Sequence, residues 1–209
     1  VEVNRPMSIP QPRILKEHKL TAAELSRMAG DNERIVPIAV KTHGADKLQA
    51  AGIAGQGVFS VIIDTGVAPH QDLPAWRIKH FYDVFAAAEI APVDPHGHGT
   101  HVAGTIGADG KLLGMAPKAN IIGIKVLDEN GSGSTASVIA GIEQAMVYYQ
   151  QGCRPMVVNM SLGYNWYGAW LASPGELATA VNPMLSATAQ SIVAGQGERN
   201  RLGLDGSGG

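Results

Sequence analysis

The sequence predicts an α/β fold in which helices cover both faces of an open, mostly parallel sheet. From about residue 35 onward, short apolar runs rich in β-branched residues alternate with glycine-rich turns and with stretches of helical periodicity. This alternation is typical of parallel strands joined by crossover helices. The 209 residues are enough for one substantial domain, and 45% hydrophobic with 16% charged residues is the composition of a globular protein with a packed core.

Four buried strands are expected, because four short apolar runs are each bounded by turn residues. They cover residues 58–63, 120–127, 156–160 and 191–194. Between the second and the third run, residues 135–150 carry an apolar stripe at helical spacing, which predicts an amphipathic crossover helix. The stripe consists of Val138, Ile139, Ile142, Met146 and Tyr149.

The two ends of the chain differ from this central part. Residues 1–34 are polar and contain prolines, which predicts an N-terminal arm with one short helix where Thr21 and Glu24 form a capping box. Residues 35–200 are the predicted domain, in which Ser-Pro-Gly-Glu at 173–176 opens a further helix that Pro183 should end or kink. Residues 201–209 are rich in glycine and predict a flexible tail.

Bulk composition argues against two classes of partner. The formal net charge is −2, and the Lys and Arg residues are scattered, so no nucleic-acid partner is expected. No apolar run approaches the length of a membrane span, so no membrane partner is expected either. Cys153 is the single cysteine and cannot form an internal disulfide. The chain starts at Val1 without a charged and apolar leader, so we expect a protein processed or trimmed at its start, for which a secreted form is one option.

Two segments carry an acid and an imidazole suited to hydrolysis. Asp64 ends the first predicted strand in Val-Ile-Ile-Asp-Thr-Gly at 61–66, and the carboxyl ends of parallel strands are where such sheets hold their sites. His98 lies in His-Gly-His-Gly-Thr-His-Val-Ala-Gly at 96–104, where a helix expected from Val102 leaves the imidazole at the helix start, facing the sheet end. Near neutral pH, a histidine held by a carboxylate takes a proton from a hydroxyl and returns it to a leaving amine.

These segments and three others resemble the subtilisin-like serine peptidases. The others are Gly-Met-Ala-Pro at 114–117, Ile-Lys-Val-Leu at 124–127 followed by Gly-Ser-Gly at 131–133, and Val-Asn-Met-Ser-Leu-Gly at 158–163. They occur in the family's order between about residues 35 and 197. The resemblance implies a serine endopeptidase with an Asp-His-Ser triad, in which Asp64 is the acid and His98 the base.

The resemblance also implies a groove for a polypeptide substrate in extended conformation. Ser161, Leu162 and Gly163 match the strand that pairs with the substrate, and Ser132 and Gly133 match the opposite rim. Substrate binding would then be β-augmentation, in which an extended peptide adds a strand to the edge of a sheet.

Three departures from the family pattern accompany this resemblance. No Gly-Thr-Ser-Met-Ala-type serine segment occurs, which predicts the front portion of a longer peptidase, truncated on the C-terminal side and inactive alone. Such a fragment would be stabilised by the missing C-terminal segment or by self-association. Gln196 stands where the family has an oxyanion-donating asparagine, and its amide is on a stem one methylene longer. The loop at 107–113, with Asp109 alone, is shorter than the family's structural calcium loop, so no cofactor or metal is expected.

Three alternatives stay open from the residues. Asp-Thr-Gly after an apolar run is also found in aspartic peptidases, where Asp64 would share a proton with a second aspartate. The spacing of His96, His98 and His101 permits a metal site, although no HExxH glutamate accompanies them. A pseudopeptidase that keeps the groove and binds peptides without turnover is the third.

Overall fold

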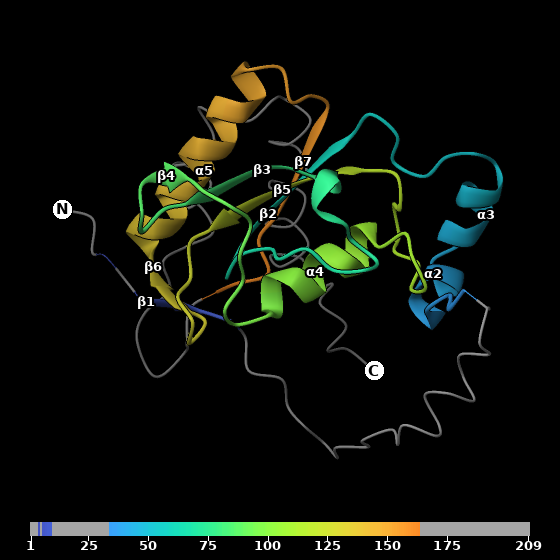
Figure 1. Ribbon diagram of the computed structural model, residues 1–209, viewed down its shortest axis with the longest axis horizontal. Coiled ribbons are helices and arrows are strands. Elements are labelled where there is room, and N and C mark those ends of the chain that lie inside the picture. Colours follow the sequence, from blue (N-terminus) through green and yellow to red (C-terminus); the bar gives the residue numbers. More distant parts are fainter. Residues whose placement is uncertain (1–3, 5, 10–33, 164–209) are drawn as a thin grey trace, which may run out of the picture. The chain divides into compact units, whose positions relative to one another are not determined.

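A five-stranded sheet forms the centre of the described part of the chain (Figure 1). The structure is a computed structural model that describes residues 4, 6–9 and 34–163. The strand order is β4-β3-β5-β2-β7, and all neighbours are parallel except the antiparallel pair β3 and β4. The strands are β2 (Phe59–Asp64), β3 (Ile78–Asp83), β4 (Ala88–Glu89), β5 (Asn120–Lys125) and β7 (Met156–Asn159). The predicted α/β class with a mostly parallel sheet is confirmed.

The two central strands, β2 and β5, are in register from Phe59 opposite Asn120 to Asp64 opposite Lys125. Five of the six residues in each strand are buried, as expected for a sheet covered on both faces. Asp64 and Lys125 thus lie side by side at the carboxyl ends of the central strands.

Helices pack on opposite faces of this sheet, because successive side chains of a strand point to opposite sides. On one face, α4 (His98–Gly107) places Ala103 in an apolar cluster with Ile62 of β2 and Ile121 of β5. On the other face, α5 (Thr135–Gln150) approaches closely through Gly141, where an added Cβ would lie 3.3 Å from the side chains of both Ile63 and Ile124. The predicted helices on both faces are therefore present.

Three predicted strands and one predicted helix match observed elements, with small differences at their ends. The runs at 58–63, 120–127 and 156–160 correspond to β2, β5 and β7, and the helix at 135–150 is α5. The expectation that the third run is buried is wrong, because β7 is the last strand of the described sheet: none of its four residues is buried, and Val157 is 59% exposed. The buried stripe of α5 is rotated by about one residue from the prediction: Ile139, Met146 and Tyr149 lie at its margins. It contains Val138, Gly141, Ile142, Ala145 and Tyr148.

The helix expected to begin at Val102 begins at His98 instead, so that prediction is wrong by four positions. The other expectations on the arm helix at 21–24, the strand at 191–194, the helix from 173 and the tail at 201–209 lie outside the described residues. The division of the chain into an arm, a domain and a tail stays a prediction.

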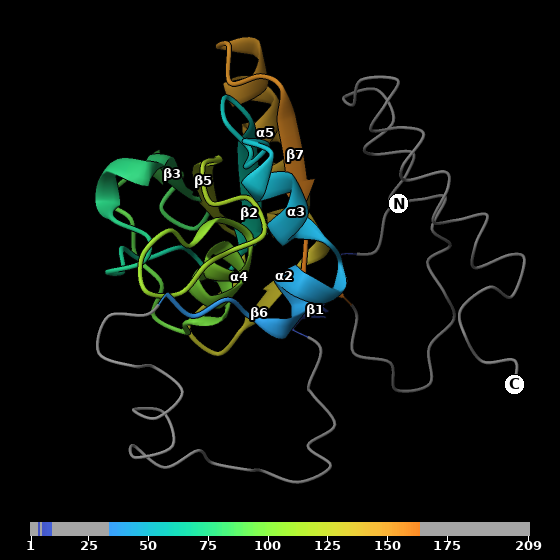
Figure 2. The ribbon, with the colours of Figure 1, turned by 90° about the vertical axis from the view of Figure 1, so that its right-hand side faces the viewer.

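Several short elements were not predicted. They include α2 (Ile38–Thr42) and α3 (Ala45–Ala50), which face the viewer in Figure 2, and the 3-10 turn η1 (Ala75–Arg77). Within the predicted arm, β1 (Pro6–Ser8) pairs antiparallel with β6 (Ser132–Ser134) to form a second, two-stranded sheet.

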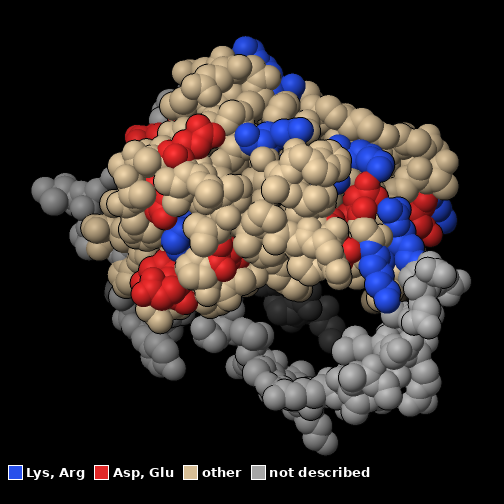
Figure 3. Space-filling model, in the orientation of Figure 1, with Lys and Arg blue, Asp and Glu red and all other residues tan. Residues whose placement is uncertain are grey.

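Charged side chains of both signs are scattered over the face in Figure 3, and large areas of it carry none. This distribution agrees with the low charged fraction of the sequence. Among the described residues, no helix combines the length and the apolar character needed to cross a bilayer.

Candidate active site

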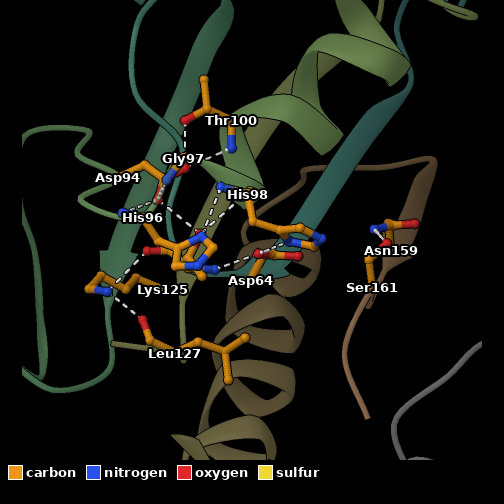
Figure 4. Close-up of polar contacts among 12 residues, drawn as sticks. Asp64, Asp94, His96, Gly97, His98, Thr100, Lys125, Leu127, Asn159 and Ser161 are labelled. Atoms are coloured by element: carbon orange, nitrogen blue, oxygen red, sulfur yellow. Dashed lines mark hydrogen bonds and ion pairs between the residues drawn. The ribbon is translucent and has the colours of Figure 1, made fainter. Parts of the chain in front are cut away.

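The side chains of Asp64 and His98 meet at the carboxyl end of β2 (Figure 4). The Nδ1 atom of His98 lies 2.7 Å from Oδ1 of Asp64. The Asp64 side chain is fully buried, whereas a quarter of the His98 side chain is exposed. Because a carboxylate only accepts hydrogen bonds, the contact places the imidazole proton on Nδ1 and leaves Nε2 as the basic nitrogen.

Close packing of α4 against the end of β2 brings the two groups together. An added Cβ at Gly99 would lie 2.0 Å from the carbonyl oxygen of Gly66 and 3.1 Å from Cβ of Asp64. Only glycine therefore lets the first turn of α4 come this near to the strand. The helix begins at His98 because Gly97, in the left-handed conformation with φ of 93°, turns the chain into it.

Asp94 ties the start of α4 to the residue after Asp64. Its Oδ2 atom accepts hydrogen bonds from the backbone N and the Oγ1 of Thr100, at 2.8 and 2.7 Å. Its Oδ1 atom accepts from Gly97 N at 2.9 Å and from Thr65 Oγ1 at 2.8 Å. Thr65 Oγ1 in turn accepts from Gly99 N at 3.0 Å, so the network links strand end, loop and helix.

The electrostatics of Asp94 follow from these contacts. Burial raises the pKa of its carboxyl, but the hydrogen bonds from Thr100, Gly97 and Thr65 outweigh burial and hold the pKa below its ordinary value. Asp94 therefore caps the start of α4 as an ionised carboxylate. Its negative charge also interacts favourably with the positive N-terminal end of the α4 dipole.

The side chain of Lys125 connects the carboxyl ends of β2 and β5. Its side chain is buried, and Nζ donates to the backbone carbonyl oxygens of Thr65, at 3.0 Å, and of Leu127. Nζ also lies 5.7 Å from the ring centroid of Phe85. The carbonyls replace the hydration that the buried ammonium group loses, and the turn after Asp64 is thereby fixed.

The predicted substrate-binding residues lie in two separate segments. Ser132 and Gly133 belong to β6, whereas Ser161, Leu162 and Gly163 follow β7 and are half-buried. Oγ of Ser161 accepts a hydrogen bond from Nδ2 of Asn159 at 2.9 Å, and both residues lie on the side of His98 away from His96 in the view of Figure 4. Gln196, the predicted oxyanion donor, lies outside the described residues.

Two of the three clustered histidines make hydrogen bonds through Nδ1. Nδ1 of His96 accepts from the backbone N of His98 at 3.3 Å, and Nδ1 of His98 is bonded to Asp64. In the described part of the chain, no three His, Cys, Asp or Glu side chains are grouped so as to hold a metal ion.

Asp109, in the loop compared with the family's calcium loop, faces two cations. Its Oδ1 lies 2.8 Å from an Arg34 nitrogen, and its Oδ2 lies 2.5 Å from Nζ of Lys118. Both carboxylate oxygens are thus already paired.

Sequence reasoning brought Asp64 and His98 together but missed Asp94 and Lys125. Asp94 lies four residues before the observed start of α4, and an aspartate ahead of a helix can accept from the free N–H groups of its first turn, so this pattern could have indicated Asp94. No local signal identifies Lys125, because its partners are backbone carbonyls brought near by the fold.

Comparisons with known proteins identify the family of the chain. Residues 55–202 match the Subtilase family. The "Thermostable alkaline protease" of Halalkalibacterium halodurans is 42% identical over 131 residues, covering 61% of this chain and 34% of the relative. "Serine protease AprX" of Bacillus subtilis is 40% identical over 118 residues, covering 53% of this chain and 26% of the relative.

A third relative gives a similar result. "Subtilisin-like protease 7" of Trichophyton verrucosum is 41% identical over 135 residues, covering 62% of this chain and 30% of the relative. The matched part of the chain therefore spans only about a third or less of the length of these three curated relatives.

Proposed function

The chain belongs to the subtilase family, and from that premise we propose that the protein it represents is a serine endopeptidase. The hydrogen bond between His98 and Asp64 carries the proposal. Nε2 of His98 takes the proton of the attacking serine hydroxyl and then gives it to the leaving amine. Asp64 holds the imidazole in the required tautomer and stabilises the imidazolium that forms.

The proposal assigns the nucleophile to residues outside these 209. No Gly-Thr-Ser-Met-Ala-type segment occurs in the sequence, and the matched part of the chain covers about a third or less of each of the three relatives. The same missing segment, or a second copy of the chain, would cover the β7 side of the sheet, where Val157 is 59% exposed. A secreted or processed form also belongs to this proposal.

The proposed substrate is a polypeptide in extended conformation that pairs with Ser161–Gly163 on one side and with Ser132 and Gly133 on the other. Gln196 would donate its side-chain amide to the developing oxyanion. The partial exposure of the His98 side chain supports access of a substrate to the imidazole.

Neither of the other two peptide-directed functions is favoured. An aspartic peptidase needs two aspartates that share a proton, whereas Asp64 is bonded to a histidine in a fold of the α/β class. A pseudopeptidase is disfavoured because the three relatives described above all carry protease names. It is nevertheless a distinct outcome of the following experiment.

The test extends the chain, in cis or in trans, with a C-terminal segment that carries the family's serine. We expect negligible labelling of the 209 residues alone by a fluorophosphonate probe, and labelling with peptide hydrolysis after the extension. His98→Ala should abolish both, whereas His101→Ala, an exposed position in the same helix, should preserve them. Labelling of a serine within the 209 residues would overturn the assignment of the nucleophile, and peptide binding without turnover would establish a pseudopeptidase.

A further inference from the structure

The 107–113 loop, which follows α4, is held by two basic side chains from outside it. Nη2 of Arg34 donates to Oδ1 of Asp109 at 2.8 Å, and Nε of the same guanidinium donates to Gly110 O at 3.0 Å. Nζ of Lys118 donates to Oδ2 of Asp109 at 2.5 Å. One carboxylate at the start of the loop therefore faces a cation at each of its oxygens.

The carboxylate of Asp109 is much less exposed than its two partners. Its side chain is 13% exposed, whereas that of Arg34 is 50% and that of Lys118 is 54% exposed. A carboxylate with so little access to water needs paired charges and hydrogen bonds to remain ionised at low cost. Burial lowers the pKa of the Arg77 guanidinium, and the charge of Asp109 opposes this shift, so a third positive side chain also lies within reach of Asp109.

The backbone next to Arg34 adds to this hold on the loop. Ile35 N donates to Lys111 O at 2.7 Å, and Leu113 N donates to Ile35 O at 3.0 Å. Within the loop, Gly110 N donates to Leu112 O at 3.3 Å. The carbonyl oxygens of residues 110–112 thus all accept hydrogen bonds from the protein itself.

A second carboxylate, that of Asp72, also faces the loop and is engaged by its backbone. Asp72 is buried, and its Oδ1 accepts from Lys111 N at 2.5 Å. Its backbone oxygen accepts from Asp109 N at 2.8 Å. A Cβ added to Gly110 would lie 2.1 Å from Oδ1 of Asp72, so the loop backbone and this carboxylate are already in close contact.

A calcium ion does not fit this arrangement. Ca²⁺ takes six to eight oxygen ligands at about 2.3–2.6 Å. Both oxygens of Asp109 and the loop carbonyls already accept from protein donors, and Oδ1 of Asp72 lies against the loop backbone. A divalent cation at Asp109 would also lie next to two positive side chains and be repelled by them.

From these contacts we infer that Arg34 and Lys118 take the place, in this chain, of the structural calcium ion that the family resemblance associates with the 107–113 loop. The guanidinium binds a carboxylate and a carbonyl with its planar fork, as is typical of arginine, and the ammonium neutralises the second carboxylate oxygen. The stability of the fold then depends on these two side chains and not on free calcium. The inference goes beyond the proposed function, since it concerns how the loop is held and not catalysis.

The first test compares the Tm of the full 209-residue chain in calcium and in EDTA, measured by circular dichroism. Calcium at about 10 mM would fill even a site of millimolar affinity. We expect the two Tm values to agree within about 1 °C, whereas binding of that affinity would raise the Tm by about 3–6 °C. A rise of this size that Asp109→Asn abolishes would overturn the inference. A rise that persists in Asp109→Asn comes from calcium bound away from this loop, as the inference requires.

The second test asks whether Arg34 itself holds the loop. In EDTA, Arg34→Gln should lower the Tm by about 2–4 °C, because the charge and the fork are both lost. Arg34→Lys keeps the charge without the fork and should recover part of this loss. Lys111→Gln is the matched control, since it removes a positive charge from the same loop at an exposed side chain. Equal effects of Arg34→Gln and Lys111→Gln would contradict the assigned role.

A double-mutant cycle separates the Arg34–Asp109 contact from general effects of charge. If the two side chains act together, Arg34→Gln with Asp109→Asn should lose little more stability than Asp109→Asn alone, whereas additive losses would overturn the inference. If Asp109→Asn is unfolded, the comparison of Arg34→Gln with Lys111→Gln decides by itself. If heating is irreversible, urea midpoints replace the Tm in every comparison.

Discussion

Asp94 holds Thr100 by two hydrogen bonds to a single carboxylate oxygen, one from the backbone and one from the hydroxyl. The same side chain reaches Thr65, the neighbour of Asp64. Thus one carboxylate joins the helix that carries the candidate base to the strand that carries the candidate acid.

Asp94→Asn should lower the free energy of unfolding by about 1–3 kcal/mol near neutral pH, because an amide offers one acceptor oxygen in place of two. The pKa of Asp94 is lowered in the folded chain, so its stabilisation is present above about pH 4, the unfolded value, and is lost as the pH falls through the folded pKa. Urea unfolding at several pH values measures this.

The difference between the unchanged chain and Asp94→Asn should therefore shrink in acid. Asp83→Asn is the control, since the side chain of Asp83 accepts from the loop amides of Phe85 and Ala86 and from no other residue that the structure describes. A pH-independent difference for Asp94→Asn would contradict the assigned role of its charge.

Gly99→Ala should destabilise the fold by about 1–3 kcal/mol, since the new methyl group would overlap the Gly66 carbonyl and push α4 away from β2. Gly104→Ala, in the same helix with nothing within 4 Å of the added atom, should be neutral or stabilising by up to about 1 kcal/mol. Chemical denaturation of both variants gives the comparison, and similar effects at the two positions would refute the packing argument.

Asp64→Asn should move the imidazole proton of His98 from Nδ1 to Nε2, because the asparagine amide can donate to Nδ1. The ¹⁵N chemical shifts of the His98 ring report the tautomer directly. Glu89 forms a separate histidine–carboxylate pair with His80. Glu89→Gln should therefore leave the His98 signals unchanged. In the extended, active protein, Asp64→Asn should reduce turnover by about 10⁴-fold.

Tyr148 should make the fold sensitive to high pH. Burial, followed by the nearby charge of Glu89, raises the pKa of Tyr148 to about 12. A raised pKa contributes stability that is complete below about pH 10, the unfolded value, and is lost as the pH rises through the folded pKa.

Tyr148→Phe keeps the ring that stacks on His80, at 4.5 Å between centroids, but removes the ionisable group. We expect the variant to lose less stability than the unchanged chain between about pH 10 and about pH 12. Denaturant unfolding across that range tests this, and parallel losses in the two proteins would contradict it.

Sequence pattern was sufficient where the structure depends on burial. β2 and β5 are apolar runs in a sheet covered on both faces, and the acid and the base lie in the segments expected of them. By contrast, β3 has the sequence Ile-Lys-His-Phe-Tyr-Asp and is only partly buried, so it shows no continuous apolar run. It forms a strand because it pairs in parallel with β5, and its own sequence does not predict this pairing.

The arm illustrates a second limit. Pro-Met-Ser has no marked strand propensity, and β1 exists because it pairs with residues far along the chain. Lys125 was missed for the same reason, since the fold brings the carbonyl of Thr65 to its side chain.

The close approach of Gly99 to the end of β2 bears on where new sequence can be inserted into the chain. The spacing of Asp64 and His98 is set where helix meets strand, and not by the length of the chain that joins them. The turn between β3 and β4, where Phe85 is 55% exposed, is thus a position for inserting new sequence, such as a fused recognition module. Unchanged ¹⁵N shifts of His98 in such an insertion variant would demonstrate that this part of the scaffold can be remodelled independently of the acid and base.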